Sequence, residues 1–441
     1  MNKTVVKLQD KSKMVNWVTD NIVTLIFVFF TLFGFLVSNG IDINFFLTDL
    51  TERFFRNAFL VLSLIIPVVA GLGLNFGIVI GAMSGQIAIV LVRYFALGGF
   101  GGLMLCFLIA LPISALLGFL TGLLYNKTRG QEMIASLIVG YFANGWYLFL
   151  FLFVVGGLIK VPVNHPMIKP DGIGIRTSID LMPVSKGGLK DSLNSILEIP
   201  FMWAVLIVSI SFLAIIVIKH ILDSKKNKKI SKFQNTIKII NMLICVVMIL
   251  ISVFSIATNS KLMNIKGVPV VTALFIIALC LFTELIMKTK LGQDFKSVGQ
   301  NQHIAEVSGI NVDKTRIIAV VISTVLAAWG MIIYIQDMGT LNTYNAHANI
   351  GLFSVAAILV GGASTSKASI KHAIIGVILF NSMFIMSPEI GASVFGSPLL
   401  GEYFRTFMVY GVIGVALGLY VWKGNKSGKL TLSSMEEDQH S

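Results

Sequence analysis

Long uninterrupted runs of apolar residues are the feature that most constrains the fold of this 441-residue chain. Runs of roughly 18 or more apolar residues cross a bilayer as helices, because in lipid a helix satisfies its own backbone hydrogen bonds. The runs lack both the alternation of barrel strands and the amphipathic period of soluble helices. Only 12% of the residues are charged, about half the share typical of soluble chains. The sequence therefore predicts an all-α polytopic membrane protein.

The apolar segments predict about 10–12 transmembrane helices. The second and third segments are short and are separated by Gly73, Leu74 and Asn75, and the tenth runs into Gly361 and Gly362. Transporters place such short, glycine-interrupted helices beside a binding site. The expected spans lie near residues 22–38, 57–73, 76–92, 100–125, 133–158, 200–219, 237–257, 268–287, 316–335, 351–363, 372–387 and 403–422.

Lys and Arg are distributed unevenly between the two sides of this map. With a cytoplasmic N-terminus, 23 of the 34 basic residues lie in loops on its side, whereas the 21 acids divide almost evenly. An excess of positive charge marks cytoplasmic loops, so both termini are expected to be cytoplasmic. The net charge of +13 then reflects these loops and anionic lipid, and not nucleic acid. The expected organisation is a cytoplasmic segment 1–21, a transmembrane domain 22–422 and a cytoplasmic tail 423–441.

Two of the predicted loops are notable for their length or charge. The extracytoplasmic loop of about 160–199 is the longest and is rich in proline and glycine; an ordered cap, a docking surface and a loose loop all fit its composition. The cytoplasmic loop 219–238 holds seven lysines against the single acid Asp223. This second loop therefore marks the cytoplasmic side most clearly.

The cytoplasmic segment 291–316, LGQDFKSVGQNQHIAEVSGINVDKTR, is polar and amphipathic and lies between two strong spans. Gly292 and Gly299 punctuate it, and Gly309 can supply the turn before the next helix begins at about Asp313. A short helix lying across the cytoplasmic face would suit a partner that moves. An ordinary solvated loop fits the same residues.

Within this segment the residues follow the order Val298-Gly299-Gln300-Asn301, then Ala305, then Gly309-Ile310 and Val312. This order resembles the loop pattern vG-x-N-x-x-A-x-x-x-G-I-x-v of ABC-importer permeases of the branched-chain amino acid, ribose and nucleoside class; the proline that usually follows the Asn is Gln302 here. In that family the loop forms a coupling helix that docks on the ATP-binding subunit. The resemblance implies ATPase-coupling roles for Asp294, Gly299, Asn301, Ala305, Gly309 and Ile310.

Three further stretches are similar to the same family: GLGLNFGIVIGAMSGQ at 71–86, GQEMIASLIVGYFANG at 130–145 and LVGGASTSKASIKHAIIG at 359–376. Together with the coupling loop they extend the resemblance over most of 57–390, although residues 200–257 fit less well. The resemblance implies two pseudo-repeated halves with short broken helices, and a hinge at Gly361 and Gly362. An internal echo of residues 127–133 in 288–295 agrees with two halves, and chance explains it equally well.

Motifs for catalysis and for nucleotide binding are absent from the sequence. No G-x-x-x-x-G-K-[ST] occurs, so ATP would be bound by a partner subunit and no cofactor is expected in this chain. No metal-ligand spacing and no catalytic triad motif is found. Cys106, Cys245 and Cys280 lie inside apolar runs and are expected to be buried hydrophobic residues. We therefore expect that the chain is not an enzyme and holds no metal.

Polar residues at membrane depth are costly, which makes them candidates for a solute pathway, although a hydrogen bond between helices explains any single one. Glu132 and Glu284 are expected at the cytoplasmic ends of their spans. Asp337, His347 and Asn349 precede the short tenth span and face either solute or solvent. Nearby aromatic residues can stack on a ring or pack in lipid. The candidate pathway residues are Asn75, Phe76, Gln86, Asn144, Trp146 and Asn381.

The sequence thus predicts the permease subunit of an ABC importer in a bacterial inner or cytoplasmic membrane. Such a subunit forms half of the pore and works with an ATP-binding subunit, a second permease subunit, an extracytoplasmic solute-binding protein and membrane lipid. A nucleoside or simple sugar is the expected solute. The alternative is a stand-alone ion-coupled secondary transporter, which would leave the coupling-loop pattern as coincidence. A membrane enzyme or scaffold is disfavoured because no catalytic constellation is present.

Overall fold

A computed structural model describes residues 21–37, 42–160, 162, 167–169, 173–182, 188–225, 232–415 and 418, and these are predominantly helical. The terminal segment 1–20, the whole predicted tail 423–441 and part of the lysine-rich loop lie outside the described residues. The helices are α2 (Ile22–Val37), α3 (Ile43–Leu62), α4 (Ile65–Val69), α5 (Ile78–Tyr94), α6 (Gly99–Lys127), α7 (Glu132–Phe149), α8 (Phe201–Lys225), α9 (Lys232–Ala257), α10 (Val270–Lys288), α11 (Lys290–Gln300), α12 (Gln302–Val307), α13 (Val312–Met338), α14 (Ile350–Val360), α15 (Ile370–Phe395) and an unlabelled helix at 398–415.

Non-α elements are few and small in the described part of the chain. A π-helical stretch, η1 (Leu150–Leu158), continues α7, and a 3-10 turn, η3 (Lys261–Asn264), follows α9. Strand β1 (Ser178–Asp180) pairs antiparallel with β4 (Thr340–Asn342), and β2 (Glu198–Ile199) pairs antiparallel with β3 (Val268–Pro269). The described residues of the long 160–199 loop therefore include ordered strands that pair with later parts of the chain.

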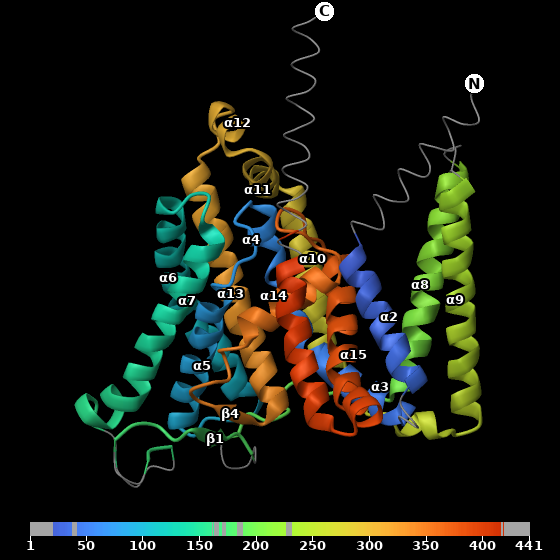
Figure 1. The fold of residues 1–441 in the computed structure, drawn as a ribbon, viewed down its shortest axis with the longest axis horizontal. Helices are drawn as coiled ribbons and strands as arrows, with labels where there is room; N and C mark the ends of the chain where they lie inside the picture. Colours follow the sequence, from blue (N-terminus) through green and yellow to red (C-terminus); the bar gives the residue numbers. More distant parts are fainter. Residues whose placement is uncertain are drawn as a thin grey trace, which may run out of the picture.

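Seven of the described helices are long and apolar enough to cross a membrane, and three shorter apolar helices accompany them. The prediction of an all-α polytopic membrane protein is confirmed. Figure 1 shows the bundle with α11 and α12 at one end, here called the α12 end, and β1 and β4 at the other, here called the β end. The short apolar helices are α2, α5 and α14, and α5 and α14 correspond to the third and tenth segments that the sequence marked as short. The second segment, near 57–73, instead covers the end of the longer α3 and α4.

The start of α3 differs from the prediction. The second span was expected to begin near residue 57, but α3 already begins at Ile43, where Asp42 accepts a hydrogen bond from the Asn44 backbone amide at 2.9 Å. Its first half holds charged residues that lower the local hydropathy and so concealed the helix. Asp49 and Arg53 pair within the helix at 2.9 Å, which satisfies two of these charges locally.

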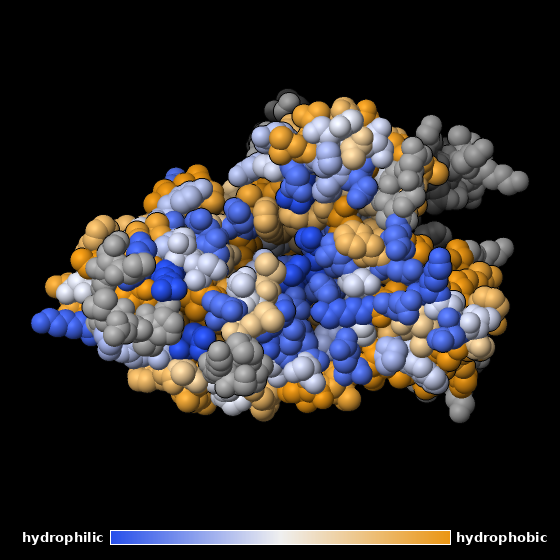
Figure 2. Space-filling model, turned by 90° about the horizontal axis from the view of Figure 1, so that it is seen from below, coloured by the Kyte–Doolittle hydropathy of each residue, from blue (hydrophilic) through white to orange (hydrophobic). Residues whose placement is uncertain are grey.

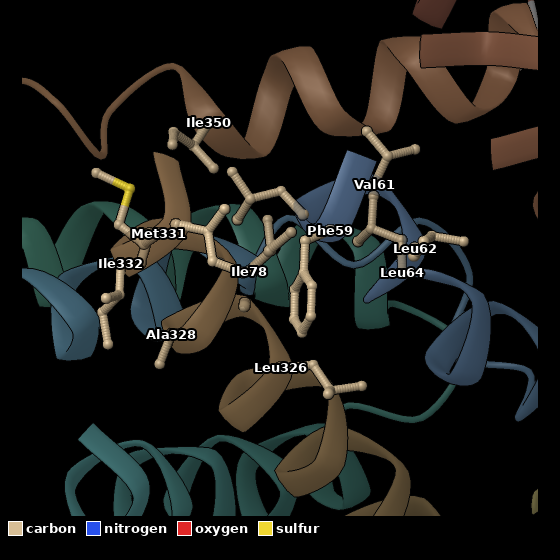
Figure 3. Packing of buried hydrophobic residues seen from close by; sticks show 14 of the residues in the cluster. Phe59, Val61, Leu62, Leu64, Ile78, Leu326, Ala328, Met331, Ile332 and Ile350 are labelled. Carbon is tan, nitrogen blue, oxygen red and sulfur yellow. The ribbon is translucent and has the colours of Figure 1, made fainter. Parts of the chain in front are cut away.

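The core lies where α13 packs against α3, α5 and α6, with α14 packed on α3 and α5. Figure 3 shows buried side chains from these elements converging, among them Phe59 of α3, Ile78 of α5 and Met331 of α13. Close helix approach depends on small residues: an ideal Cβ on Gly81 of α5 would lie 2.4 Å from the Thr324 carbonyl oxygen of α13. In lipid, such close backbone packing replaces the hydrophobic effect as the force that holds helices together.

Candidate functional site

The segment between α4 and α5 leaves the helical conformation inside the bundle. Gly71 and Gly73 there have φ values of +75° and +68°, a conformation that glycine adopts without strain. Asn75 is 2% exposed, and its Oδ1 accepts hydrogen bonds from the Gly77 amide at 3.0 Å and from the Tyr125 hydroxyl at 2.9 Å. The hydrogen bond from Tyr125 therefore ties this non-helical segment, just before α5 begins, to α6.

Gln86, Asn144 and His347 form one hydrogen-bonded network that joins α5, α7 and the segment before α14. His347 Nδ1 lies 2.8 Å from Gln86 Oε1, and His347 Nε2 lies 2.7 Å from Asn144 Oδ1. Gln86 and His347 are fully buried, so His347 faces neither bulk solvent nor lipid. Because a neutral imidazole has one N–H, one of the two amides must turn its NH2 group toward the ring. Tyr147 packs against the imidazole with ring centroids 4.7 Å apart.

A cavity of about 210 Å³, here called cavity A, lies beside this network. Phe76 just before α5 and Asn349 just before α14 both border it, so the beginnings of two short helices meet at one place. Helix beginnings carry partial positive charge and can orient polar groups of a solute. Cavity A is lined by Phe76, Val79, Ser136, Leu137, Gly140, Tyr141, Asn144, His347, Ala348, Asn349, Gly351, Leu352 and Tyr410.

The candidate pathway residues fall in three places. Phe76 and Asn144 line cavity A directly, while Asn75 and Gln86 lie behind its wall. Asn381 is 4% exposed and lines a separate cavity of about 220 Å³, here called cavity B, which shares Asn349 with cavity A.

Trp146 is apart from the other candidates. Its side chain is 61% exposed and borders an apolar groove of about 480 Å³ between α5, α6 and α7. The groove presents apolar side chains, which suits lipid or a packed helix better than a polar solute. The structure therefore does not bring Trp146 together with the polar candidates.

The predicted coupling segment forms two helices, α11 and α12, that stand at the α12 end of the bundle (Figure 1). Asn301 caps α12, because its Oδ1 accepts a hydrogen bond from the Ile304 amide at 3.1 Å. Ala305 is 1% exposed and packs in a small cluster with Val298, Val312 and the partly buried Ile310. The predicted short helix on this face is present.

The outer surface of α12 is unusual for a solvated helix. Ile304 is 62% exposed and Val307 is 78% exposed on a six-residue helix. Gly309 follows with φ +82° and so turns the chain toward α13, as the sequence predicted. Asp294 on α11 is partly exposed. A protruding helix with apolar side chains at its tip has the form of a docking element.

Gly299 connects this element to the broken helix. A Cβ added to Gly299 would lie 2.1 Å from the Val69 carbonyl oxygen, and one added to Gly71 would lie 2.7 Å from the Gly299 Cα. The backbones of α11 and of the segment after α4 are thus in direct contact. Only a few residues separate this contact from Asn75 and Phe76 at the wall of cavity A. A short stretch of chain therefore links the α11 contact to the wall of cavity A.

Ion pairs make a second connection from α12 to the bundle. Arg129, in the turn between α6 and α7, contacts Glu306 at 3.1 Å and Asp313 at 2.5 Å. Hydrogen bonding to Asp313 and to Glu306 raises the pKa of Arg129 above its ordinary value. Glu132, expected at the end of its span, does lie there but is buried against Arg316 at 2.5 Å. Arg316 also donates to the Tyr125 carbonyl oxygen at 3.1 Å.

Gly361 and Gly362, the predicted hinge, join the end of α14 to the approach of α15. A Cβ on Gly361 would lie 1.8 Å from the His372 carbonyl oxygen, and Gly362 has φ +94°. These positions thus require glycine for close packing and for a turn. A hinge role for them stays a prediction.

The candidate residues did not include Arg129, Arg316 and Tyr125. Tyr125 and Arg129 lie near the turn between α6 and α7, and Arg316 lies at the beginning of α13. At such span ends charged residues usually face water. Their pairing depends on contacts nearly two hundred residues apart in sequence. Within the described residues no group of three or more His, Cys, Asp and Glu side chains could hold a metal ion.

The family model described as "Branched-chain amino acid transport system / permease component" matches residues 46–416. The chain is 31% identical over 157 residues to the xylose transport system permease protein XylH of Haemophilus influenzae, covering 36% of this chain and 39% of that protein. It is 33% identical over 108 residues to the nucleoside ABC transporter permease protein NupB of Lactococcus lactis, covering 24% and 28% respectively.

The probable ABC transporter permease protein YphD of Escherichia coli is 32% identical over 115 residues, covering 26% of this chain and 34% of that protein. The matches thus span less than half the length of these relatives. No solved structure matches the chain. The family match, by contrast, extends from within α3 to the end of the helix at 398–415 and includes both cavities and the α11–α12 pair. The chain therefore belongs to the family of permease components of branched-chain amino acid transport systems.

Proposed function

We propose that this chain is the membrane-spanning permease subunit of an ATP-driven importer for a small polar solute, a nucleoside or a simple sugar. The observation that carries the proposal is the α11–α12 pair, whose apolar tip projects from the bundle while Gly299 contacts the broken helix beside cavity A. A separate ATP-binding subunit would dock on this tip. Its closure on ATP would move α11, and the movement would alter the cavity wall at Asn75 and Phe76.

The chain would form half of a pore. Tyr141 and Tyr410 border cavity A while remaining 75% and 60% exposed, so one side of the cavity is open to the surroundings of the chain. A second permease subunit, identical or homologous, would complete it. Two of the named relatives are a xylose permease and a nucleoside permease, which supports an uncharged ring-bearing solute over the amino acid in the family's description.

The unequal distribution of Lys and Arg supports a cytoplasmic α12 end in a bacterial inner or cytoplasmic membrane, with both termini on that side. The β end would then receive solute from an extracytoplasmic solute-binding protein.

Co-purification tests this function. The full-length chain is expressed together with a candidate ATP-binding subunit, and the complex is reconstituted to measure ATP hydrolysis and solute uptake. Ala305→Glu places a carboxylate in the buried cluster of Val298 and Val312. We expect this variant to lose solute uptake and to lower the rate of solute-stimulated ATP hydrolysis at least tenfold. Gln131→Glu, which adds a carboxylate at an exposed position in the turn before α7 and outside α11 and α12, is the matched control and should retain both activities.

Two results would contradict the proposal. Uptake by the purified chain alone, driven by an ion gradient without an ATP-binding partner, would establish the alternative of a secondary transporter. Coupled uptake by the Ala305→Glu variant at the wild-type rate would remove the coupling role from α12. Folding of each variant is checked by its thermal unfolding midpoint in detergent.

A further inference from the structure

Cavity B lies apart from the His347 network, between α3, the last turns of α13, the segment before α14, and α15. Its lining includes Tyr334 and Asn345, which flank β4, so it lies toward the β end. Figure 2 views that end of the molecule: hydrophilic side chains gather over its middle, apolar ones surround them, and the surface is hollowed near the centre. Of the candidate residues, only Asn381 lines cavity B.

One wall of cavity B is aromatic. Phe353 of α14 and the pair Phe380 and Phe384 of α15 contact one another, with ring centroids 4.7 Å to 6.1 Å apart. Phe380 is 4% exposed and Phe384 is 8% exposed, so the wall is held firmly in the core. Adjacent phenyl rings give a preformed surface on which a flat or ring-shaped molecule can stack.

The polar part of the lining comes mainly from α3. It includes Arg53, Arg56 and Asn57, and the Asn57 side-chain amide lies 3.4 Å from Asn381 Oδ1 on the aromatic side. Arg56 Nε is buried and has no hydrogen-bond partner among the described residues. A buried donor without a partner costs about 1–3 kcal/mol, more when charged, unless a ligand or water accepts its hydrogen bond.

The charges at cavity B are balanced by carboxylates outside its lining. Arg53 pairs with Asp49 at 2.9 Å, and Arg56 lies 3.4 Å from Asp337. Behind the aromatic wall, Arg405 lies 4.4 Å from the centre of the Phe384 ring and forms an ion pair with Glu402. Each guanidinium thus retains N–H donors while its charge is already neutralised, so the site favours a hydrogen-bond acceptor and not an anion.

We propose that cavity B binds an uncharged solute with a ring, stacked on Phe353, Phe380 and Phe384, and that Arg56 Nε donates a hydrogen bond to an oxygen or ring nitrogen of that solute. A nucleoside and a free sugar share this chemistry. A nucleotide does not, because its phosphate would enter a site without unpaired positive charge. An amino acid would bring two charges. The proposal rests on the proposed importer function and assigns cavity B and Arg56 to the binding of its solute.

The test uses the full-length chain in lipid nanodiscs and equilibrium dialysis with labelled uridine, ribose, uridine monophosphate and leucine. Uridine or ribose should bind, whereas uridine monophosphate and leucine should bind at least tenfold more weakly. Arg56→Lys keeps the charge beside Asp337 but removes the Nε donor, and it should weaken binding about tenfold. Arg93→Lys is the matched control: Arg93 Nε donates to the Asp180 carbonyl oxygen away from cavity B, and binding should be unchanged.

A second variant tests whether the base of uridine stacks on the phenyl rings. Phe353→Leu removes part of the aromatic surface and should weaken uridine more than ribose, because the planar base stacks more strongly on phenyl rings. Equal binding of uridine and uridine monophosphate would overturn the proposal, as would wild-type affinity in Arg56→Lys or no binding of either neutral probe. If these results occur while ATP-coupled uptake persists, the importer function stands without this site. If the neutral probes bind but no ATP-binding subunit associates, cavity B stands and the importer function fails.

Discussion

Helices α8 and α13 are similarly apolar, yet they have opposite places in the molecule. The most apolar stretch of α8 has a mean hydropathy of 2.8 and only 11% of it is buried, whereas for α13 the values are 2.3 and 61%. In Figure 1 the α8–α9 hairpin stands at the edge of the bundle and α13 runs through its middle. Within the described residues, α8 packs chiefly on α9.

Residue size distinguishes the two helices where hydropathy does not. The core-facing side of α13 carries Ser323, Thr324, Ala327, Ala328 and Gly330, against which α3, α5 and α6 approach at backbone distance. The lipid-accessible part of α8 instead presents large side chains, Ile and Phe, outward. Small residues therefore mark helices that pack on other helices, and large branched ones mark helices that face lipid. Three sets of substitutions, at Arg316, at Gly85 and at a pair of isoleucines, test this comparison.

The largest effect is expected at Arg316, which is 1% exposed at the beginning of α13. Arg316→Leu removes one partner of a buried ion pair and leaves Glu132 charged and unpaired. We expect a loss of about 3–5 kcal/mol in the free energy of unfolding, measured by denaturant titration in detergent. Lys219→Leu, at an exposed position of α8, is the control and should change stability little.

The double variant Arg316→Leu with Glu132→Gln separates charge from packing. Since the uncompensated carboxylate is gone, we expect it to recover part of the lost stability. A double variant as unstable as the single one would show that Arg316 acts by shape and hydrogen bonding to the Tyr125 carbonyl, and not by its pairing with Glu132.

A smaller effect is expected where α5 packs on α13. A Cβ on Gly85 would lie 2.5 Å from the Ala328 carbonyl oxygen, so Gly85→Ala must move one helix. We expect a cost of about 1–3 kcal/mol from overpacking, read from the unfolding midpoint. Gly101→Ala in α6 is the control, because an added Cβ there meets no atom within 4 Å. Equal midpoints for the two variants would mean that the α5–α13 contact adjusts without cost.

The sequence predicted the helical class, the breaks near Gly73 and Gly361, and the short helices of the coupling segment, because each depends on local composition. Long apolar runs and glycines at turns determine such features without tertiary context. The start of α3 was missed, since its charges are neutralised by partners as distant as Asp337, which pairs with Arg56. The pairing of Gln86, Asn144 and His347 was equally hidden, although all three residues were noted as polar residues within or beside spans.

The smallest effect is expected on α8, and a matched pair of isoleucines measures it. Ile215 of α8 is 60% exposed, whereas Ile332 of α13 is fully buried in the core of Figure 3. Ile215→Ala should change the free energy of unfolding by no more than about 0.5 kcal/mol, since lipid or detergent replaces the lost contacts. Ile332→Ala leaves a cavity that surrounding helices fill only partly, and should cost about 2–5 kcal/mol. A cost at Ile215 close to that at Ile332 would mean that another protein surface covers α8 in the folded protein. The hairpin would then be an interface, and residue size alone would no longer distinguish packed helices from lipid-facing ones.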